Sequence, residues 1–242
     1  MAYRLAGLLR YAAIQFVVLT ALAMALYAGG TWFDPATAHY HFTDNFLSDL
    51  GMTHAFSGRA NYASAAVFGI ALGSVGAALI AFVWTWKQFA FERRRAAVLG
   101  HTAAVLGTLS GLAFVGVAVT PFDVALRAHN TLVIAAFGLL MLFVAATTIV
   151  MWRNGISRAL GAANLAYLAC VAGYVALVLR GPRMWTPHGH AVQVVGQKAI
   201  AYASMLHVIY LTTTIRRSIG NRCSDRRPRT RSPAQDRTAS AP

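Results

Sequence analysis

Charged residues are scarce in this sequence: Asp, Glu, Lys and Arg make up 12% of the 242 residues, about half the share in an average soluble domain. Acidic residues are the scarcest, with seven Asp and Glu against 21 Lys and Arg. The two cysteines, Cys170 in an apolar stretch and Cys223 in a polar one, form no pair that would staple an external loop. These shortages exclude an ordinary soluble enzyme and a disulfide-bonded scaffold.

Apolar residues fill the space that charge leaves, with 57% hydrophobic residues and a mean hydropathy of +0.54. Six apolar stretches are each long enough to cross a hydrocarbon core of about 30 Å. Backbone groups in lipid must be satisfied within their own segment, so the sequence predicts an all-α polytopic membrane protein with a bundle of six transmembrane helices. The expected spans are 11–29, 60–86, 97–119, 131–152, 160–179 and 194–215.

The distribution of Lys and Arg predicts the orientation of the chain. Sixteen of the 21 fall in the N-terminus, in the loops after the second and fourth spans, and in the C-terminal tail, which the positive-inside rule places in the cytoplasm. Both termini are therefore expected on the cytoplasmic side of a bacterial plasma membrane. The first apolar stretch is expected to stay as a helix, because it is longer than a signal-peptide core and no clear cleavage site follows it.

Two units are expected: a transmembrane domain over 1–215 and a disordered basic tail over 216–242. The arginines of the tail fit a stop-transfer anchor first, because juxtamembrane arginines are expected beside any final span, and contacts with anionic lipid head groups are the alternative. Membrane lipids are thus the expected partners and nucleic acid is not. Glycines at helical spacing in the second and third spans, such as Gly76 and Gly111, predict that these two helices pack closely.

Polar residues gather where the expected spans meet the outer face. The segment 43–51 resembles a short interfacial helix with an apolar face, which leaves Ser48 and Asp49 facing the span ends. Lys198 follows Gln197 at the start of the sixth span, where an unpaired ammonium is costly. We expect Asp49 or Asp123 to be its partner, either as a structural ion pair or as part of a ligand site.

Histidines are concentrated in the expected outer loops and allow a second interpretation. Two His-x-His pairs, His39 with His41 and His188 with His190, could hold zinc together with nearby aspartates. Neutral histidines serve equally well as interfacial or solvated residues, and no HExxH-type helix accompanies them. No metal or other cofactor is therefore favoured.

Three short motifs occur in order around the six expected helices. They are Ser48-Asp49-Leu50-Gly51 before the second span, Pro121-x-Asp123 with His129 after the third, and Gln197-Lys198 at the sixth. In this arrangement the chain, over roughly 11–215, resembles the bacterial membrane family called domain of unknown function 998, which is distantly similar to the Frag, DRAM and Sfk group of six-span proteins linked to lipid remodelling. The resemblance implies that Asp49, Asp123, His129 and Lys198 form a shared polar set on the outer face. It implies no catalytic residue.

The leading hypothesis is an inner-membrane protein, more a binder than an enzyme, whose outer polar pocket binds a lipid head group or another small polar ligand. The residues expected to form the pocket are Asp49, Asp123, His129, Lys198, Ser48 and Gln197. One alternative is an intramembrane metal-dependent lipid hydrolase or acyltransferase. Another is a small transporter that uses Lys198, His101 and His207 as a path across the bilayer. The ligand and the oligomeric state do not follow from the sequence.

Overall fold

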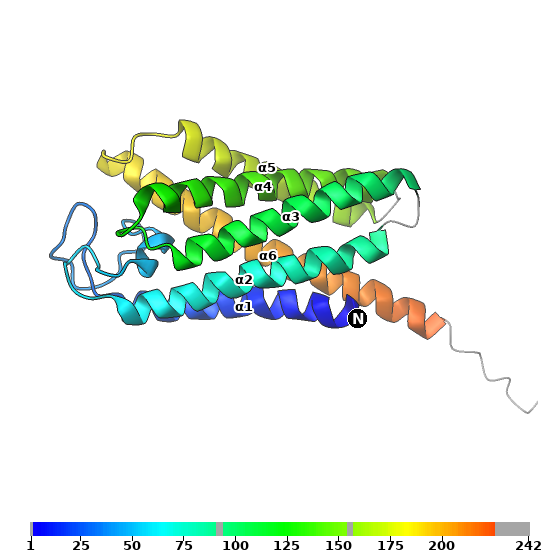
Figure 1. The fold of residues 1–242 in the computed structure, drawn as a ribbon, viewed down its shortest axis with the longest axis horizontal. Coiled ribbons are helices and arrows are strands. Elements are labelled where there is room, and N and C mark those ends of the chain that lie inside the picture. Colours follow the sequence, from blue (N-terminus) through cyan, green and yellow to red (C-terminus); the bar gives the residue numbers. More distant parts are fainter. Residues whose placement is uncertain (1, 91–93, 154–156, 226–242) are drawn as a thin grey trace, which may run out of the picture.

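A computed structural model describes residues 2–90, 94–153 and 157–225, with side chains for 7–84, 98–153 and 157–214. Within these residues the elements run in chain order as six long helices and one short 3-10 helix, η1 (Figure 1). They are α1 (Ala2–Leu26), η1 (Leu47–Gly51), α2 (Tyr62–Ala90), α3 (Arg94–Val119), α4 (Leu126–Arg153), α5 (Arg158–Arg180) and α6 (Pro187–Asp225).

The six long helices confirm the all-α architecture expected from the apolar stretches. Each contains a segment of 20 to 28 residues that is long and apolar enough to cross a membrane. A helix satisfies its backbone hydrogen bonds internally, so such segments are stable in lipid. By helix length and hydropathy the chain is a multi-pass membrane protein.

The helices follow one another around a closed ring. Each packs against its neighbours in the sequence, and α6 packs against α1 to complete the circle. Figure 1 shows the N-terminus and the described end of α6 at the same end of the bundle. Helix α6 runs past the expected end at residue 215 to Asp225; the rest of the expected tail, 226–242, lies outside the described residues.

Helices α2 and α3 approach closely at two glycines, as the spacing of small residues predicts. A Cβ added to Gly76 would lie 2.6 Å from the carbonyl oxygen of Gly111, and a Cβ on Gly111 would lie 2.8 Å from that of Gly76. No side chain other than hydrogen fits between these backbones, which is the arrangement that small residues permit in membrane helices.

The longest connection, residues 27–61, lies at the end of the bundle opposite the termini (Figure 1). We call this end of the bundle the loop end. Helix η1 contacts α1, α2 and α6 there. Its Leu47 and Leu50 are buried and pack with Ala23 of α1 and Phe68 of α2. The connection thus folds back onto three helices, and burial of these leucines holds it there.

The turn that starts this connection depends on glycine. Gly29 and Gly30 have φ angles of 94° and 86°, a region that other residues adopt only with strain. A Cβ on Gly30 would also lie 2.2 Å from the backbone nitrogen of Ser57. Gly30 at the start of the connection therefore lies directly against Ser57 near its end.

The expected helix over 43–51 is shorter than predicted, because regular helix is confined to the 3-10 turn Leu47–Gly51. The residues before it form a hydrogen-bonded turn in which the amides of Asp44 and Asn45 donate to the carbonyl of His41. The Asn45 side chain also bonds the backbone, and such bonds compete with helix formation.

Candidate functional site

Asp49 lies at the centre of the loop end and is 1% exposed. Its Oδ2 accepts hydrogen bonds from the backbone N–H of Phe46 at 2.8 Å and from Asn45 Nδ2 at 3.3 Å. Burial raises the pKa of Asp49 to about 7, although these two hydrogen bonds and the charge of Lys198 act in the opposite direction. The carboxyl group is therefore poised to change charge near neutral pH.

Asn45, which is fully buried, connects the parts of the loop end. Its side-chain oxygen accepts from the backbone N–H of His41 at 2.9 Å, and its Nδ2 donates to the carbonyl of Gly30 at 3.0 Å as well as to Asp49. Its backbone oxygen accepts from the hydroxyl of Tyr40 at 2.9 Å. Asn45 thus ties the first turn of the connection to η1.

Lys198, from α6, is 2% exposed and lies beneath this segment. Its ammonium donates a hydrogen bond to the backbone oxygen of Asn45. The ring centroids of Tyr40 and Phe42 lie 5.4 and 5.0 Å from Nζ, within the range of cation–π attraction. The charge is therefore held by a carbonyl dipole and two aromatic rings.

The expected ion pair of Lys198 with Asp49 or Asp123 is not formed. Among the side chains that the structure describes, no carboxylate oxygen lies within 4.0 Å of Nζ. The charge of Asp49 does act on Lys198 from a greater distance. The backbone of Asn45 takes the position that a contacting carboxylate would occupy, while the carboxylate of Asp49 caps the amide of Phe46.

Gln197 and Ser48 also belong to this end of the bundle, as expected. The Oε1 atom of Gln197 accepts a hydrogen bond from the backbone N–H of Leu47 at 2.7 Å, so α6 satisfies an amide at the start of η1 that has no helical partner. Ser48 is buried within η1. We call Asn45, Ser48, Asp49, Gln197 and Lys198 the buried cluster.

Asp123 lies apart from the buried cluster, on the exposed surface after α3. Thr53 donates to it through its backbone N–H at 3.0 Å and its hydroxyl at 2.6 Å, and the N–H of His54 donates at 3.0 Å. Partial burial raises the pKa of Asp123, but these hydrogen bonds lower it by more, so it lies below its ordinary value. Asp123 fastens the end of the long connection to the loop between α3 and α4.

His129, at the start of α4, is 3% exposed and also lies outside the buried cluster. Its Nδ1 is 2.7 Å from the carbonyl oxygen of Thr120, so this nitrogen carries the hydrogen. Its Nε2 is buried and has no hydrogen-bond partner, and the ring meets the edge of Phe122. The four residues expected as one polar set therefore divide into a buried pair, Asp49 and Lys198, and two separate loop contacts.

The histidine pairs do not converge on a metal site. His39 and His188 are exposed, Nδ1 of His41 lies 3.2 Å from Oδ2 of Asp44, and Nε2 of His190 donates to the Asp44 carbonyl at 2.7 Å. Among the side chains described, at 7–84, 98–153 and 157–214, no group of three His, Cys, Asp or Glu residues could hold a metal ion. The zinc alternative thus has no ligand set in that part of the chain.

The contacts of several residues at this end were not predicted from the sequence. His190 is buried between the rings of Phe33 and Phe46. Asn61 accepts from the N–H of Ala28 and donates to two carbonyls around η1. Asn61 directly precedes α2, a position where Asn side chains often cap, and this was the available signal; Asn45 lies two residues before η1.

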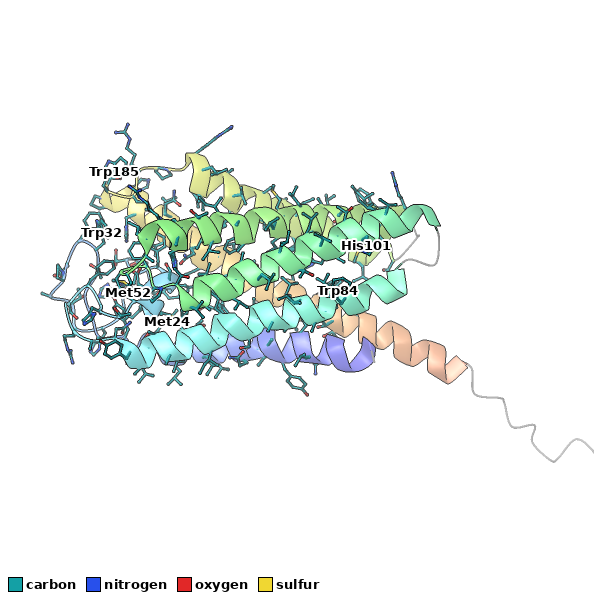
Figure 2. All side chains as sticks on the ribbon, viewed as in Figure 1. Met24, Trp32, Met52, Trp84, His101 and Trp185 are labelled. Atoms are coloured by element: carbon teal, nitrogen blue, oxygen red, sulfur yellow. The ribbon has the colours of Figure 1, made fainter. Side chains whose placement is uncertain are left out.

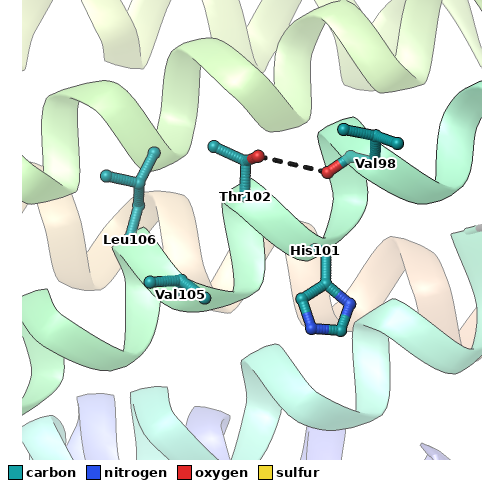
Figure 3. A pocket seen from close by; sticks show the side chains of 5 residues that line it. All are labelled: Val98, His101, Thr102, Val105 and Leu106. Carbon is teal, nitrogen blue, oxygen red and sulfur yellow. Dashed lines mark hydrogen bonds between the residues drawn. The ribbon is translucent and has the colours of Figure 1, made fainter.

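The proposed transmembrane path is not supported by the positions of the other histidines. His207 of α6 bonds Asn164 of α5 at 3.0 Å and stacks on Tyr167, which is the polar packing typical of membrane helices. His101 is exposed on α3, in an open groove of about 540 Å³ lined by apolar residues and Thr102 (Figure 3). It therefore lies outside the interior that contains His207 and Lys198.

Tryptophans mark the two ends of the bundle. Trp32 and Trp185 are exposed at the loop end, whereas Trp84 lies towards the opposite end (Figure 2). Exposed tryptophan rings favour the boundary between lipid and water.

No known family model, curated protein or solved structure matches the chain.

Proposed function

We propose that the loop end is a binding site for the head group of a membrane lipid or for another small polar ligand. The observation that carries the proposal is Lys198, a buried ammonium in a membrane helix that contacts no carboxylate among the described side chains. Intramembrane charges are costly and are usually retained for function. The aromatic residues on the exposed side of the same end favour a position at the head-group level.

The positions of the three motif segments support the proposed resemblance to the domain of unknown function 998 family. The segment 48–51 forms most of η1, Gln197 and Lys198 bond the residues at its start, and Asp123 bonds the residues that follow it. Segments far apart in the sequence thus meet at one end of the bundle. A shared ligand site would account for the meeting of these three segments.

The same proposal includes an orientation. We infer that the loop end faces the outside of a bacterial plasma membrane and that both termini face the cytoplasm. The excess of Lys and Arg near the opposite end and in the tail supports this. The ligand would then enter from the outer leaflet or from the outer aqueous phase.

Lipid analysis of the purified full chain tests the binding function. Lipids that co-purify with wild type would be identified by mass spectrometry and compared with those of Lys198→Met and Asp49→Asn, with amounts normalised to the most abundant membrane lipid. We expect one lipid class to be enriched in wild type, depleted in Lys198→Met and retained in Asp49→Asn, which keeps a polar side chain but carries no negative charge. Asp34→Asn, an exposed aspartate of the same end, is the matched control and should retain the lipid. Equal lipid profiles in all four proteins would refute the proposal.

A further inference from the structure

We propose that the ligand of the loop end carries a phosphate group, that Lys198 binds this phosphate, and that the Phe42 ring is the movable cover of the site. This inference rests on the proposed function and specifies its ligand class. A phosphate on a lipid and free phosphate share the chemistry, and the experiment below separates the two sources.

The first step of the argument concerns charge. Lys198 carries three N–H donors, and the one hydrogen bond described for Nζ goes to the backbone oxygen of Asn45. A carbonyl dipole and two aromatic faces stabilise a cation less than an anion in direct contact does. The site therefore has the donors that an anionic oxygen group requires, and its positive charge contacts no carboxylate among the described side chains.

The second step concerns access. Tyr40 is fixed, because its hydroxyl donates to the backbone oxygens of Asn45 and Phe46 at 2.9 and 3.1 Å. Phe42 has no such bond to hold it: its ring lies 5.0 Å from Nζ, yet the residue is 53% exposed. One exposed ring therefore covers the ammonium, and its rotation is a small motion on the timescale of side-chain flips.

The third step concerns the neighbouring carboxyl group. With a pKa of about 7, Asp49 is largely neutral in mildly acidic solution, and it then does not counter the charge of Lys198. At higher pH the ionised carboxylate opposes an incoming anion. The other titratable groups that act on this pair are Tyr27 at the end of α1 and Tyr40 and Asp44 in the connection; α2 contributes the uncharged Ser64.

Binding of inorganic phosphate to the detergent-purified full chain at pH 6 gives the direct test. We expect Phe42→Ala to bind several-fold more tightly than wild type, because the cost of moving the ring is removed. Lys198→Met should lose at least tenfold in affinity and Lys198→Arg should stay within several-fold of wild type. The matched controls are Arg59→Met, an exposed cation, and Phe33→Ala, an exposed ring that contacts His190; both should bind like wild type.

Nanodiscs separate the lipid from the free anion. One set would contain phosphatidylglycerol and the other a phosphate-free diglycosyl diacylglycerol, with retained lipid measured by native mass spectrometry. Selective retention of phosphatidylglycerol that requires Lys198 supports both proposals. Retention of the glycolipid in a manner that requires Lys198 keeps the binding function and refutes the phosphate inference.

Two further outcomes distinguish the proposals from each other. Phosphate binding that requires Lys198, without retention of either lipid, would support the phosphate site and refute the lipid as its source. Phosphate binding that is the same in wild type, Lys198→Met and Phe42→Ala would refute the inference, and the Phe42→Ala result stands even where Lys198→Met does not fold, because Phe42 is exposed.

Discussion

Asp123 and Thr53 lie 70 residues apart in the sequence, and both donors of the threonine bond the carboxylate of the aspartate. The contact joins the loop that follows α3 to the connection that contains η1. It is a charge-assisted cluster, since the N–H of His54 donates to the same group. The two polar connections at the loop end are thus held as one unit.

Asp123→Ala should loosen this unit. The site is exposed, so water replaces part of the lost bonding, and we expect a loss of about 1 kcal/mol in stability. Thermal unfolding in detergent measures the loss, and proteolysis of the 52–61 segment should become faster. His39→Ala, at an exposed residue of the same end, is the control; an equal effect of both variants would contradict a specific role for the clamp.

Asp49 makes stability depend on pH in a direction opposite to that of a salt-bridged aspartate. Its pKa is about 7 in the folded chain against an ordinary value of 3.8. Below pH 4 it is protonated in both states; between pH 4 and 7 the unfolded chain releases the proton first, so stability falls as pH rises and levels off above about pH 7. The whole change is on the order of 4 kcal/mol or less.

Asp49→Asn should remove this part of the pH dependence, because the amide does not titrate. Melting temperatures of wild type and variant from pH 4 to 9 measure it, and Asp34→Asn should keep the slope of wild type. The contradicting outcome is a melting temperature of wild type that rises steadily from pH 4 to 7, with a slope that is no flatter in Asp49→Asn. It would show that the buried carboxyl is ionised over this whole pH range.

The contact between α2 and α3 should not tolerate a methyl group. Gly76→Ala places a Cβ 2.6 Å from the backbone oxygen of Gly111, so the helices must separate, at a cost of about 1–3 kcal/mol. Gly138→Ala is the control, since its Cβ would meet no atom within 4 Å and alanine favours helix. We expect the melting temperature to fall in the first variant and to stay or rise in the second.

The fold was predictable because each span is an uninterrupted apolar stretch, a signal that depends on local composition alone. The meeting of Gln197 and Lys198 with the segment before α2 also followed, since span ends on one face share a depth. The sequence did not predict that Asp123 and His129 lie apart from Asp49 and Lys198. Residues of equal depth point in different directions around the ring, and the sequence does not specify those directions.

Asn45 shows a second limit on what the sequence can predict, which is the path of a loop. Its role depends on the path of the backbone between Gly30 and η1, which brings the carbonyl of Gly30 to its side chain. Nothing in a short polar segment specifies such a path before the loop is folded. The same holds for Asp123, whose partners at Thr53 and His54 belong to a distant segment.

The closed ring has a consequence for the order of assembly. Helix α6 is made after the other five helices described, and it completes the surroundings of α1, which is made before them. Until α6 is inserted, the amide of Leu47 lacks the acceptor that Gln197 provides, and one side of α1 faces lipid. A nascent chain with five helices is therefore an open arc without Gln197 and Lys198, and insertion of the sixth helix both closes the arc and completes the buried cluster.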